Sequence, residues 1–254
     1  MCNLYSFTRS IDAMRQLFAK PFNVPVTNLP PQPGIFPDYA APIIRNLAGA
    51  DQPELAMVRW GMPSSRKAQL DAATKRADKL RAKGKEVDFD QLLRMEPDSG
   101  TTNVRNTSSA HWKRWLGVEN RCLVPFTAFS EFNREAGGDV WFALDEDRPL
   151  GFFAGIWAPQ WTSVRKVKTG EETIDVFAFL TTEPNAEVEP IHPKAMPVIL
   201  TNPVDLELWM SSPWEIAKGL QRPLPDGSLQ IVSRGQKKDP PEPRAEPAQA
   251  ALLL

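Results

Sequence analysis

The chain has 254 residues, of which 42% are hydrophobic and 24% charged, and its formal net charge is −1. These values are typical of a globular protein, and no apolar run approaches the roughly 18 residues that span a bilayer. The opening sequence MCNLYSFTRSIDAM lacks the basic segment and apolar run of a secretory signal. We therefore expect a cytoplasmic protein without a membrane partner, and the near-neutral charge argues mildly against a dedicated nucleic-acid binder.

Cysteine and histidine are both scarce. Cys2 and Cys122 are the two cysteines, and His111 and His192 are the two histidines. Two thiols do not make a disulfide framework, which fits a reducing compartment. Their spacing from the histidines does not resemble a zinc site. We expect no metal and no cofactor, and we expect Cys122, in an apolar run, to be buried and inert.

The first third of the chain alternates between regular and irregular segments. Apolar residues at helical spacing predict a helix over 8–20. Residues 21–42 are rich in proline, which breaks helices, and predict an irregular but packed segment. Apolar runs predict strands at 43–45 and 55–60, and a helix is expected over 65–84.

The segment 65–85 is strongly basic. It carries eight lysines and arginines against two aspartates. Such a segment can approach phosphates and bind them in a salt-sensitive manner. It can equally be the solvated face of a helix, and the sequence leaves both interpretations open.

The rest of the chain is dominated by short β-type runs separated by charged, glycine or proline turns. One helix is expected over 204–210, with Asn202 as its cap. This succession predicts an α+β fold with a largely antiparallel, barrel-like curled sheet and peripheral helices. We expect one domain over 1–233 and a disordered tail over 234–254. The expected strands cover 122–129, 140–145, 151–159, 175–182, 197–201 and 229–233.

Cys2 follows the initiator methionine, and a small second residue normally permits removal of Met1. Cys2 would then carry both a thiol and a free α-amino group with a pKa of about 7.7–8.0. This amine can attack an aldehyde to form an imine, and the thiol can close onto the imine carbon as a five-membered thiazolidine. An internal cysteine cannot do this because its nitrogen is part of an amide.

Further motifs accompany Cys2 along the chain. They are RWGMP at 59–63, NVR at 103–105, Glu131 after RCLVPFTAFS, and His192 in IHPKAMPVIL. In this order, and together with Met-Cys at the start, they resemble the SRAP (SOS-response-associated peptidase) family of abasic-site crosslinking proteins. The resemblance runs from Cys2 to about residue 233.

The resemblance implies a function and four catalytic residues. Cys2 would form a thiazolidine with the ring-opened sugar of an abasic site in single-stranded DNA, protecting the site during the DNA damage response. Asn103 would orient Cys2, and Glu131 would shuttle protons. His192 would protonate the sugar oxygen to open the ring, or stabilise the intermediate. Weak lyase activity would accompany crosslinking, because an imine promotes β-elimination of the 3′ phosphate.

The resemblance also implies DNA contacts and a monomer. Arg105 would hold a phosphate, and Trp60 and Pro31 would form an apolar wall against neighbouring bases. Phe132 and Lys194 are further expected contacts with the single-stranded DNA partner.

Several positions depart from the family pattern. Asn3 and Leu4 stand where Gly-Arg is common, and Ala195 stands where arginine is common before Met-Pro. These two departures remove positive charge and could weaken the grip on DNA. Phe132 replaces a frequent tryptophan.

Two other functions stay open at the level of sequence. One is a thiol peptidase in which Cys2 is the nucleophile, His192 the base and Asn103 the orienting residue, acting either on other peptides or on Met1 alone. The other is a non-covalent single-stranded DNA-binding module, in which Cys2 has no chemical role.

Overall fold

The computed structural model describes residues 2–17, 22–25 and 29–239. Its centre is a closed barrel of five strands, because β10 pairs with β4 in parallel and with β9 antiparallel. Antiparallel pairs β4–β3, β3–β6 and β6–β9 complete the ring. Closure removes the exposed strand edges that an open sheet would leave. The barrel strands are β3 (Ala40–Arg45), β4 (Glu54–Trp60), β6 (Arg121–Phe126), β9 (Gly151–Lys166) and β10 (Gly170–Thr182).

Three two-residue strands extend this sheet. β5 (Asn103–Val104) pairs in parallel with β10, β11 (Met196–Pro197) pairs with β10, and β12 (Ile199–Leu200) pairs with β9. Beyond the barrel, β9 and β10 continue together as a long hairpin.

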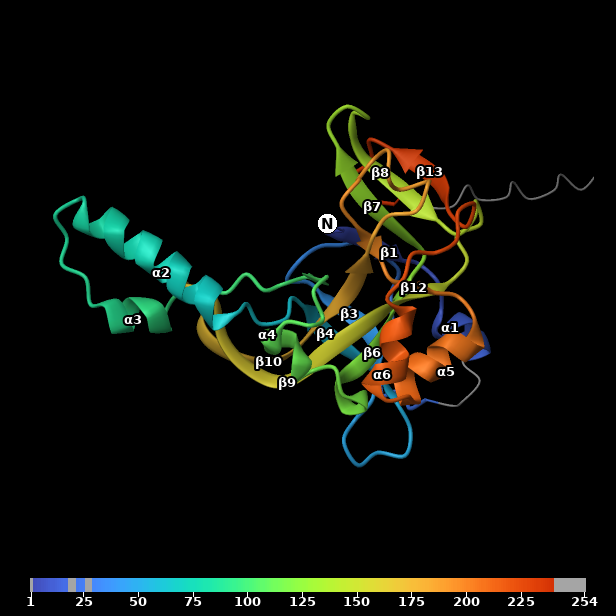
Figure 1. The fold of residues 1–254 in the computed structure, drawn as a ribbon, viewed down its shortest axis with the longest axis horizontal. Coiled ribbons are helices and arrows are strands. Elements are labelled where there is room, and N and C mark those ends of the chain that lie inside the picture. Colours follow the sequence, from blue (N-terminus) through green and yellow to red (C-terminus); the bar gives the residue numbers. More distant parts are fainter. Residues whose placement is uncertain (1, 18–21, 26–28, 240–254) are drawn as a thin grey trace, which may run out of the picture.

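A second, five-stranded antiparallel sheet stands beside the barrel (Figure 1). Its order is β13 (Gln230–Arg234), β8 (Gly138–Ala143), β7 (Ala128–Asn133), β1 (Leu4–Phe7) and β2 (Gln32–Ile35). Side chains alternate across this sheet, so Tyr5 and Phe129 join the main core while Leu4 and Ala128 pack on the other face. The Tyr5 ring lies 5.1 Å from that of Trp60, which joins the sheet to the barrel.

Six α-helices are found in the described part of the chain, and they lie outside both sheets (Figure 1). α5 begins after Asn202, whose side chain accepts a hydrogen bond from the Asp205 amide at 2.9 Å and so caps the helix. This confirms the helix expected over 204–210. The helices are α1 (Ile11–Leu17), α2 (Arg66–Arg81), α3 (Phe89–Arg94), α4 (Ala110–Lys113), α5 (Pro203–Ser211) and α6 (Trp214–Ala217), with 3-10 turns at Val118–Asn120 and Lys218–Leu220.

The expected fold class is confirmed as α+β with a barrel and peripheral helices. The single strand expected over 122–129 is wrong, because the chain changes sheets at Thr127 between β6 and β7. The Thr127 amide donates to the Ser6 carbonyl at 2.8 Å instead of continuing the barrel ladder. The irregular segment expected over 21–42 is also wrong in part, because β2 and the start of β3 lie within it. These strands form although β2 contains Pro33 and β3 contains Pro42.

The beginning of the expected tail belongs to the fold. Arg234 ends β13, and residues 235–239 run back over the outer face of the second sheet. The Asp239 carboxylate is buried, where it pairs with Arg148 at 3.1 Å and accepts from Ser6 Oγ at 2.7 Å. Disorder expected over 234–239 is therefore wrong, and 240–254 lie outside the described residues.

Candidate active site beside the first strand

Cys2 lies immediately before β1 and is almost fully buried. Its Sγ donates a hydrogen bond to the Leu4 carbonyl at 3.4 Å. Burial raises the pKa of this thiol well above its usual value, and the negative charge of Glu131 adds to the effect. The thiol is therefore protonated at neutral pH, and the Glu131 carboxylate lies close enough to disfavour its ionisation.

Asn103 fixes the backbone of Cys2. It belongs to β5, whose parallel pairing with β10 places it beside Phe179. Its Nδ2 donates to the Cys2 carbonyl at 2.8 Å and to Thr102 Oγ1 at 2.8 Å. Its Oδ1 is buried and accepts no hydrogen bond from the described residues. A buried amide oxygen without a donor is costly, so this atom is suited to a donor that a ligand or the processed N-terminus supplies.

Glu131 approaches Cys2 from the neighbouring strand. The register Leu4↔Ser130 places Glu131 in β7 beside the start of β1. Its side chain is 2% exposed, and burial raises the pKa of this carboxyl from 4.5 to about 7. Near neutral pH it is thus partly protonated and partly ionised, which allows it both to donate and to accept a proton.

His192 completes the group from the loop that precedes β11. Its Nε2 lies 3.9 Å from Glu131 Oε2, and its Nδ1 lies 3.0 Å from the Ala195 carbonyl. The loop is held against β7 because Asn133 Nδ2 donates to the Ile191 carbonyl at 2.8 Å. Burial lowers the pKa of this imidazole below 6.5, so it is mainly neutral at pH 7.

The four residues expected to be catalytic are thus brought together from four separate segments. They provide a thiol, a backbone anchor, a carboxyl with a pKa near neutrality and a neutral imidazole. Nucleophilic addition with proton transfer is the chemistry that this set can perform. No group of three or more histidine, cysteine, aspartate or glutamate side chains suited to a metal ion occurs among the described residues.

Three of the expected DNA contacts are exposed near this group. Arg105 follows β5 directly, and its Nη1 donates to the Lys194 carbonyl at 3.4 Å. Its Nη2 also pairs with Glu183 at 3.4 Å, which partly offsets the guanidinium charge. Phe132 is 64% exposed, but strand alternation places its ring on the opposite face of β7 from Glu131.

The other two expected contacts need correction. Trp60 is fully buried, its ring packs at 5.2 Å on Phe179, and its Nε1 donates to the Thr102 carbonyl at 3.1 Å. It therefore supports the candidate site from within the core and offers no exposed surface on which a DNA base could stack. Pro31 precedes β2 at the end that pairs with Phe7, about five residues along β1 from Cys2. That is roughly 16 Å at the rise of a strand, so Pro31 lies well away from Cys2.

Sequence reasoning missed two residues of this region. Tyr5 lies under the site with its hydroxyl buried and without a hydrogen bond from the described residues. Burial raises its pKa, and the nearby Cys2 contributes. Thr102 Oγ1 donates to Asn3 Oδ1 at 3.1 Å and so joins the start of the chain to β5. The alternation in LYSF is the only sequence signal for Tyr5, and four residues are too few to assign a strand.

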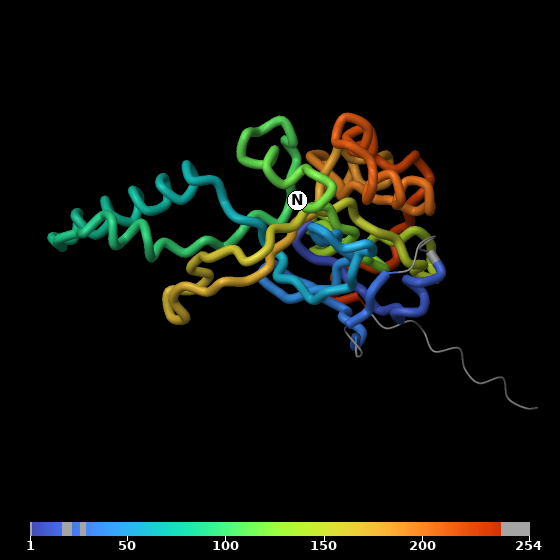
Figure 2. The backbone as a smooth tube through the Cα atoms, turned by 90° about the horizontal axis from the view of Figure 1, so that it is seen from below, coloured from blue at the N-terminus to red at the C-terminus, as the bar shows by residue number. Residues whose placement is uncertain are grey.

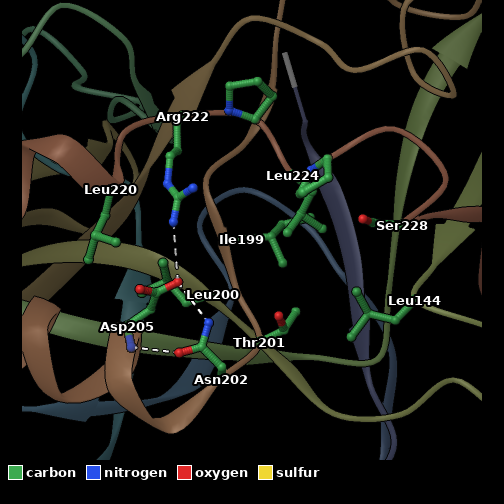
Figure 3. A pocket seen from close by; sticks show the side chains of 12 residues that line it. Leu144, Ile199, Leu200, Thr201, Asn202, Asp205, Leu220, Arg222, Leu224 and Ser228 are labelled. Atoms are coloured by element: carbon green, nitrogen blue, oxygen red, sulfur yellow. Dashed lines mark hydrogen bonds and ion pairs between the residues drawn. The ribbon is translucent and has the colours of Figure 1, made fainter.

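A pocket of about 420 Å³ lies elsewhere, between the start of α5 and the loop after Leu220 (Figure 3). On its wall Arg222 pairs with Asp205 at 3.6 Å, and Asn202 caps α5 beside them. None of the expected catalytic residues lines this pocket.

Comparison with known proteins agrees with this geometry. The family model described as "SOS response associated peptidase (SRAP)" matches residues 1–234. The chain belongs to the SRAP family. The match extends through β13, so both sheets and the residues around Cys2 lie within the family domain. No protein with a curated function matches this SRAP protein.

Solved structures share the fold. A protein from Bordetella bronchiseptica is 24% identical, with 90% of this chain and 97% of that chain covered and a TM-score of 0.57. One from Bacteroides thetaiotaomicron is 22% identical over 90% of each chain, with a TM-score of 0.58. A phage-related protein from B. bronchiseptica is 17% identical over 90% and 92%, with a TM-score of 0.57. Within the described part of this SRAP protein, no helix has the length and apolarity needed to cross a membrane.

Proposed function

We propose that this SRAP protein bonds covalently to abasic sites in single-stranded DNA through Cys2 and protects them. The observation that carries the proposal is the position of Glu131, a buried carboxyl with a pKa of about 7, beside Cys2. An acid and base of that pKa is what imine formation at neutral pH requires. The family name links such proteins to the SOS response, which fits a role in DNA damage.

The chemistry begins with removal of Met1, which frees the Cys2 amine. The amine nitrogen adds to the aldehyde carbon of the ring-opened sugar, and its proton moves to the oxygen. Protonation of that hydroxyl by Glu131 expels one water and leaves an iminium ion, which returns its N–H proton to the Glu131 carboxylate to give the imine. Cys2 Sγ then adds to the imine carbon, and the thiol proton passes through Glu131 to the nitrogen, which closes the thiazolidine.

His192 and Asn103 serve this sequence in different ways. The imidazole takes a proton at Nε2 from Glu131, whose Oε2 lies 3.9 Å away, and passes that proton to the ring oxygen as the sugar opens. Asn103 is a positioning residue, because it holds the Cys2 carbonyl and so limits where the new amine can point. At the imine stage, loss of the adjacent sugar proton leads to β-elimination of the 3′ phosphate, so weak lyase activity is expected.

The test uses single-stranded DNA with one abasic site and a denaturing gel. The wild type should give a heat-stable band. Cys2→Ser keeps an amine but no thiol, so it should give a band only when borohydride reduces the imine. Cys122→Ala, which changes the buried cysteine in β6, should crosslink as the wild type does. A heat-stable adduct formed by Cys2→Ser without reductant would refute the thiazolidine.

The geometry favours this function over the two alternatives. A cysteine peptidase needs a thiolate, and burial together with Glu131 raises the pKa of the Cys2 thiol. His192 Nε2 lies 3.9 Å from Glu131 Oε2, which supports proton exchange between these two side chains. Peptide turnover by pure protein, or full activity with Met1 retained in an intact-mass spectrum, would favour the peptidase. Equal binding of intact and abasic strands without an adduct would favour the non-covalent module.

A further inference from the structure

The helices α2 and α3 form an arm that projects from the barrel (Figures 1 and 2). The chain leaves the barrel at Met62 and returns at Thr101, where the two residues form an antiparallel bridge with N–O distances of 2.9 and 2.6 Å. Within α2 only Ala73 and Ala77 are buried, on the side that packs against α3. The arm thus adds little to the core of the protein, and its exposed face is free to serve another purpose.

The root of the arm is rigidly held. The buried Arg165 donates to the Asp98 carbonyl at 3.0 Å and also to the Gly61 carbonyl. The Asp98 carboxylate accepts from the amides of Ser64 and Gly100, both at 2.9 Å. These bonds clamp the outgoing and returning chains together, so the direction of the arm is fixed relative to the barrel.

The returning chain leads directly into the candidate site. One residue after the bridge, Thr102 binds the side chain of Asn3, and the next residue, Asn103, holds Cys2. A DNA strand that reaches Cys2 therefore lies within a few residues of the root of the arm. α2 spans 16 residues, or about 24 Å, which matches about seven nucleotides at ~3.4 Å each.

Five of the six basic residues of α2 fall into two groups. Lys67, Arg76 and Arg81 each form an ion pair, with Asp71, Glu96 and Asp78 respectively. Lys75 and Lys79 are one turn apart on the face away from Ala73 and Ala77, and Lys83 follows just after the helix. Within the described chain, these three lysine side chains have neither a hydrogen bond nor an ion pair with a protein group.

The other residues on this face indicate what it binds. Toward the start of the helix this face continues with Ala68 and Ala72, whose side chains are small, so it offers no large apolar group that a protein partner could bury. The two aspartates of α2, Asp71 and Asp78, are already paired with Lys67 and Arg81. A row of unpaired lysines complements the phosphates of a nucleic-acid strand.

We infer that the basic face of α2, formed by Lys75, Lys79 and Lys83, binds the phosphate backbone of the DNA strand that flanks the site at Cys2. The inference rests on the proposed function for the identity of the strand. It gives the protein an extended, sequence-independent grip on DNA where Leu4 and Ala195 provide no charge at the site itself.

The test compares two triple variants with equal loss of charge. One replaces Lys75, Lys79 and Lys83 with glutamine, which keeps helix propensity. The control replaces the exposed Lys218, Lys237 and Lys238, which lie elsewhere on the surface. Binding of an intact single-stranded oligonucleotide of about 20 nucleotides is measured against salt. The arm variant should reduce the slope of log K against log salt by about 2, since each lost contact contributes about 0.7.

The affinity of the arm variant should fall ~10- to 100-fold at ~0.1 M salt. The control should change the slope by less than half as much. A triple variant with arginine at Lys75, Lys79 and Lys83 should have the wild-type slope. Crosslinking to a five-nucleotide abasic strand, too short to reach the arm, should proceed at the wild-type rate. If the wild type forms no adduct, the proposed function fails while the salt slope still tests the arm. An unchanged slope, or lost binding to anionic vesicles with normal oligonucleotide binding, would overturn the inference.

Discussion

Asn103 Nδ2 donates a hydrogen bond to the Cys2 carbonyl at 2.8 Å, across 101 positions of the sequence. The bond joins the first residues of the second sheet to β5, which extends the barrel through β10. Because Asn103 holds the Cys2 carbonyl, it limits the directions in which the Cys2 side chain and nitrogen can point. This relationship gives the first prediction.

Asn103→Ala should slow crosslinking ~10- to 100-fold at saturating DNA, because loss of the anchor misplaces the Cys2 amine relative to the aldehyde. Affinity for intact single-stranded DNA should be unchanged, which separates positioning from binding. The exposed Asn106→Ala, three residues along the chain, is the matched control and should keep the wild-type rate. A parallel loss of rate and affinity in Asn103→Ala would contradict a positioning role.

Glu131→Gln should change the pH dependence of stability. A folded-state pKa of about 7 against 4.5 means that the folded protein holds this proton more tightly than the unfolded chain. The free energy of unfolding of the wild type therefore falls by about 3 kcal/mol, through ionisation of this group, as the pH rises from about 4.5 to about 7. Glutamine cannot ionise, so the variant should gain stability relative to the wild type between pH 5 and pH 8 while crosslinking more slowly.

Denaturant unfolding at the two pH values measures this effect. Glu135→Gln, an exposed carboxyl in the turn after β7, is the control and should show the same pH dependence as the wild type. Unfolding curves of Glu131→Gln and wild type that shift in parallel with pH would rule out the elevated pKa.

Arg121→Met should strongly destabilise the fold. The buried guanidinium donates to the Leu116 carbonyl from Nε and Nη2, and to the Trp209 and Ser212 carbonyls from Nη1 at 2.9 and 2.6 Å. Methionine leaves three carbonyls without donors, at a cost of roughly 1–3 kcal/mol each before relaxation. A fall of at least ~3 kcal/mol in unfolding free energy is expected. The control, Arg134→Met at an exposed position, should lower the unfolding free energy by less than ~0.5 kcal/mol.

The folded domain should end beyond residue 233. Asp239→Ala leaves the buried Arg148 without its carboxylate partner, which should cost about 3–5 kcal/mol. A chain that ends after Asp239 should unfold at the same denaturant concentration as the full protein, whereas one that ends after Ser233 should be clearly less stable. Equal stability of the two truncated chains would show that residues 234–239 are dispensable.

Local patterns were enough to predict several elements. Helical spacing and the Asn202 cap predicted α5, and alternating apolar runs predicted β8 and β13, because these signals depend on near neighbours in the chain. Two errors arose where tertiary contacts decide. The break at Thr127 depends on Ser6 from another strand, and β2 forms despite Pro33 because β1 lies beside it.

The sequence by itself predicted the α+β class and the four residues of the proposed site: Cys2, Asn103, Glu131 and His192. Their types and motif order are properties of the chain alone. The tertiary structure decided that Glu131 is buried, which gives its carboxyl a pKa near neutrality, and that Trp60 supports the site instead of facing DNA. It also decided that a basic helix lies on an arm rooted beside Asn103. Burial and proximity arise from residues far apart in sequence, so no local pattern could supply them.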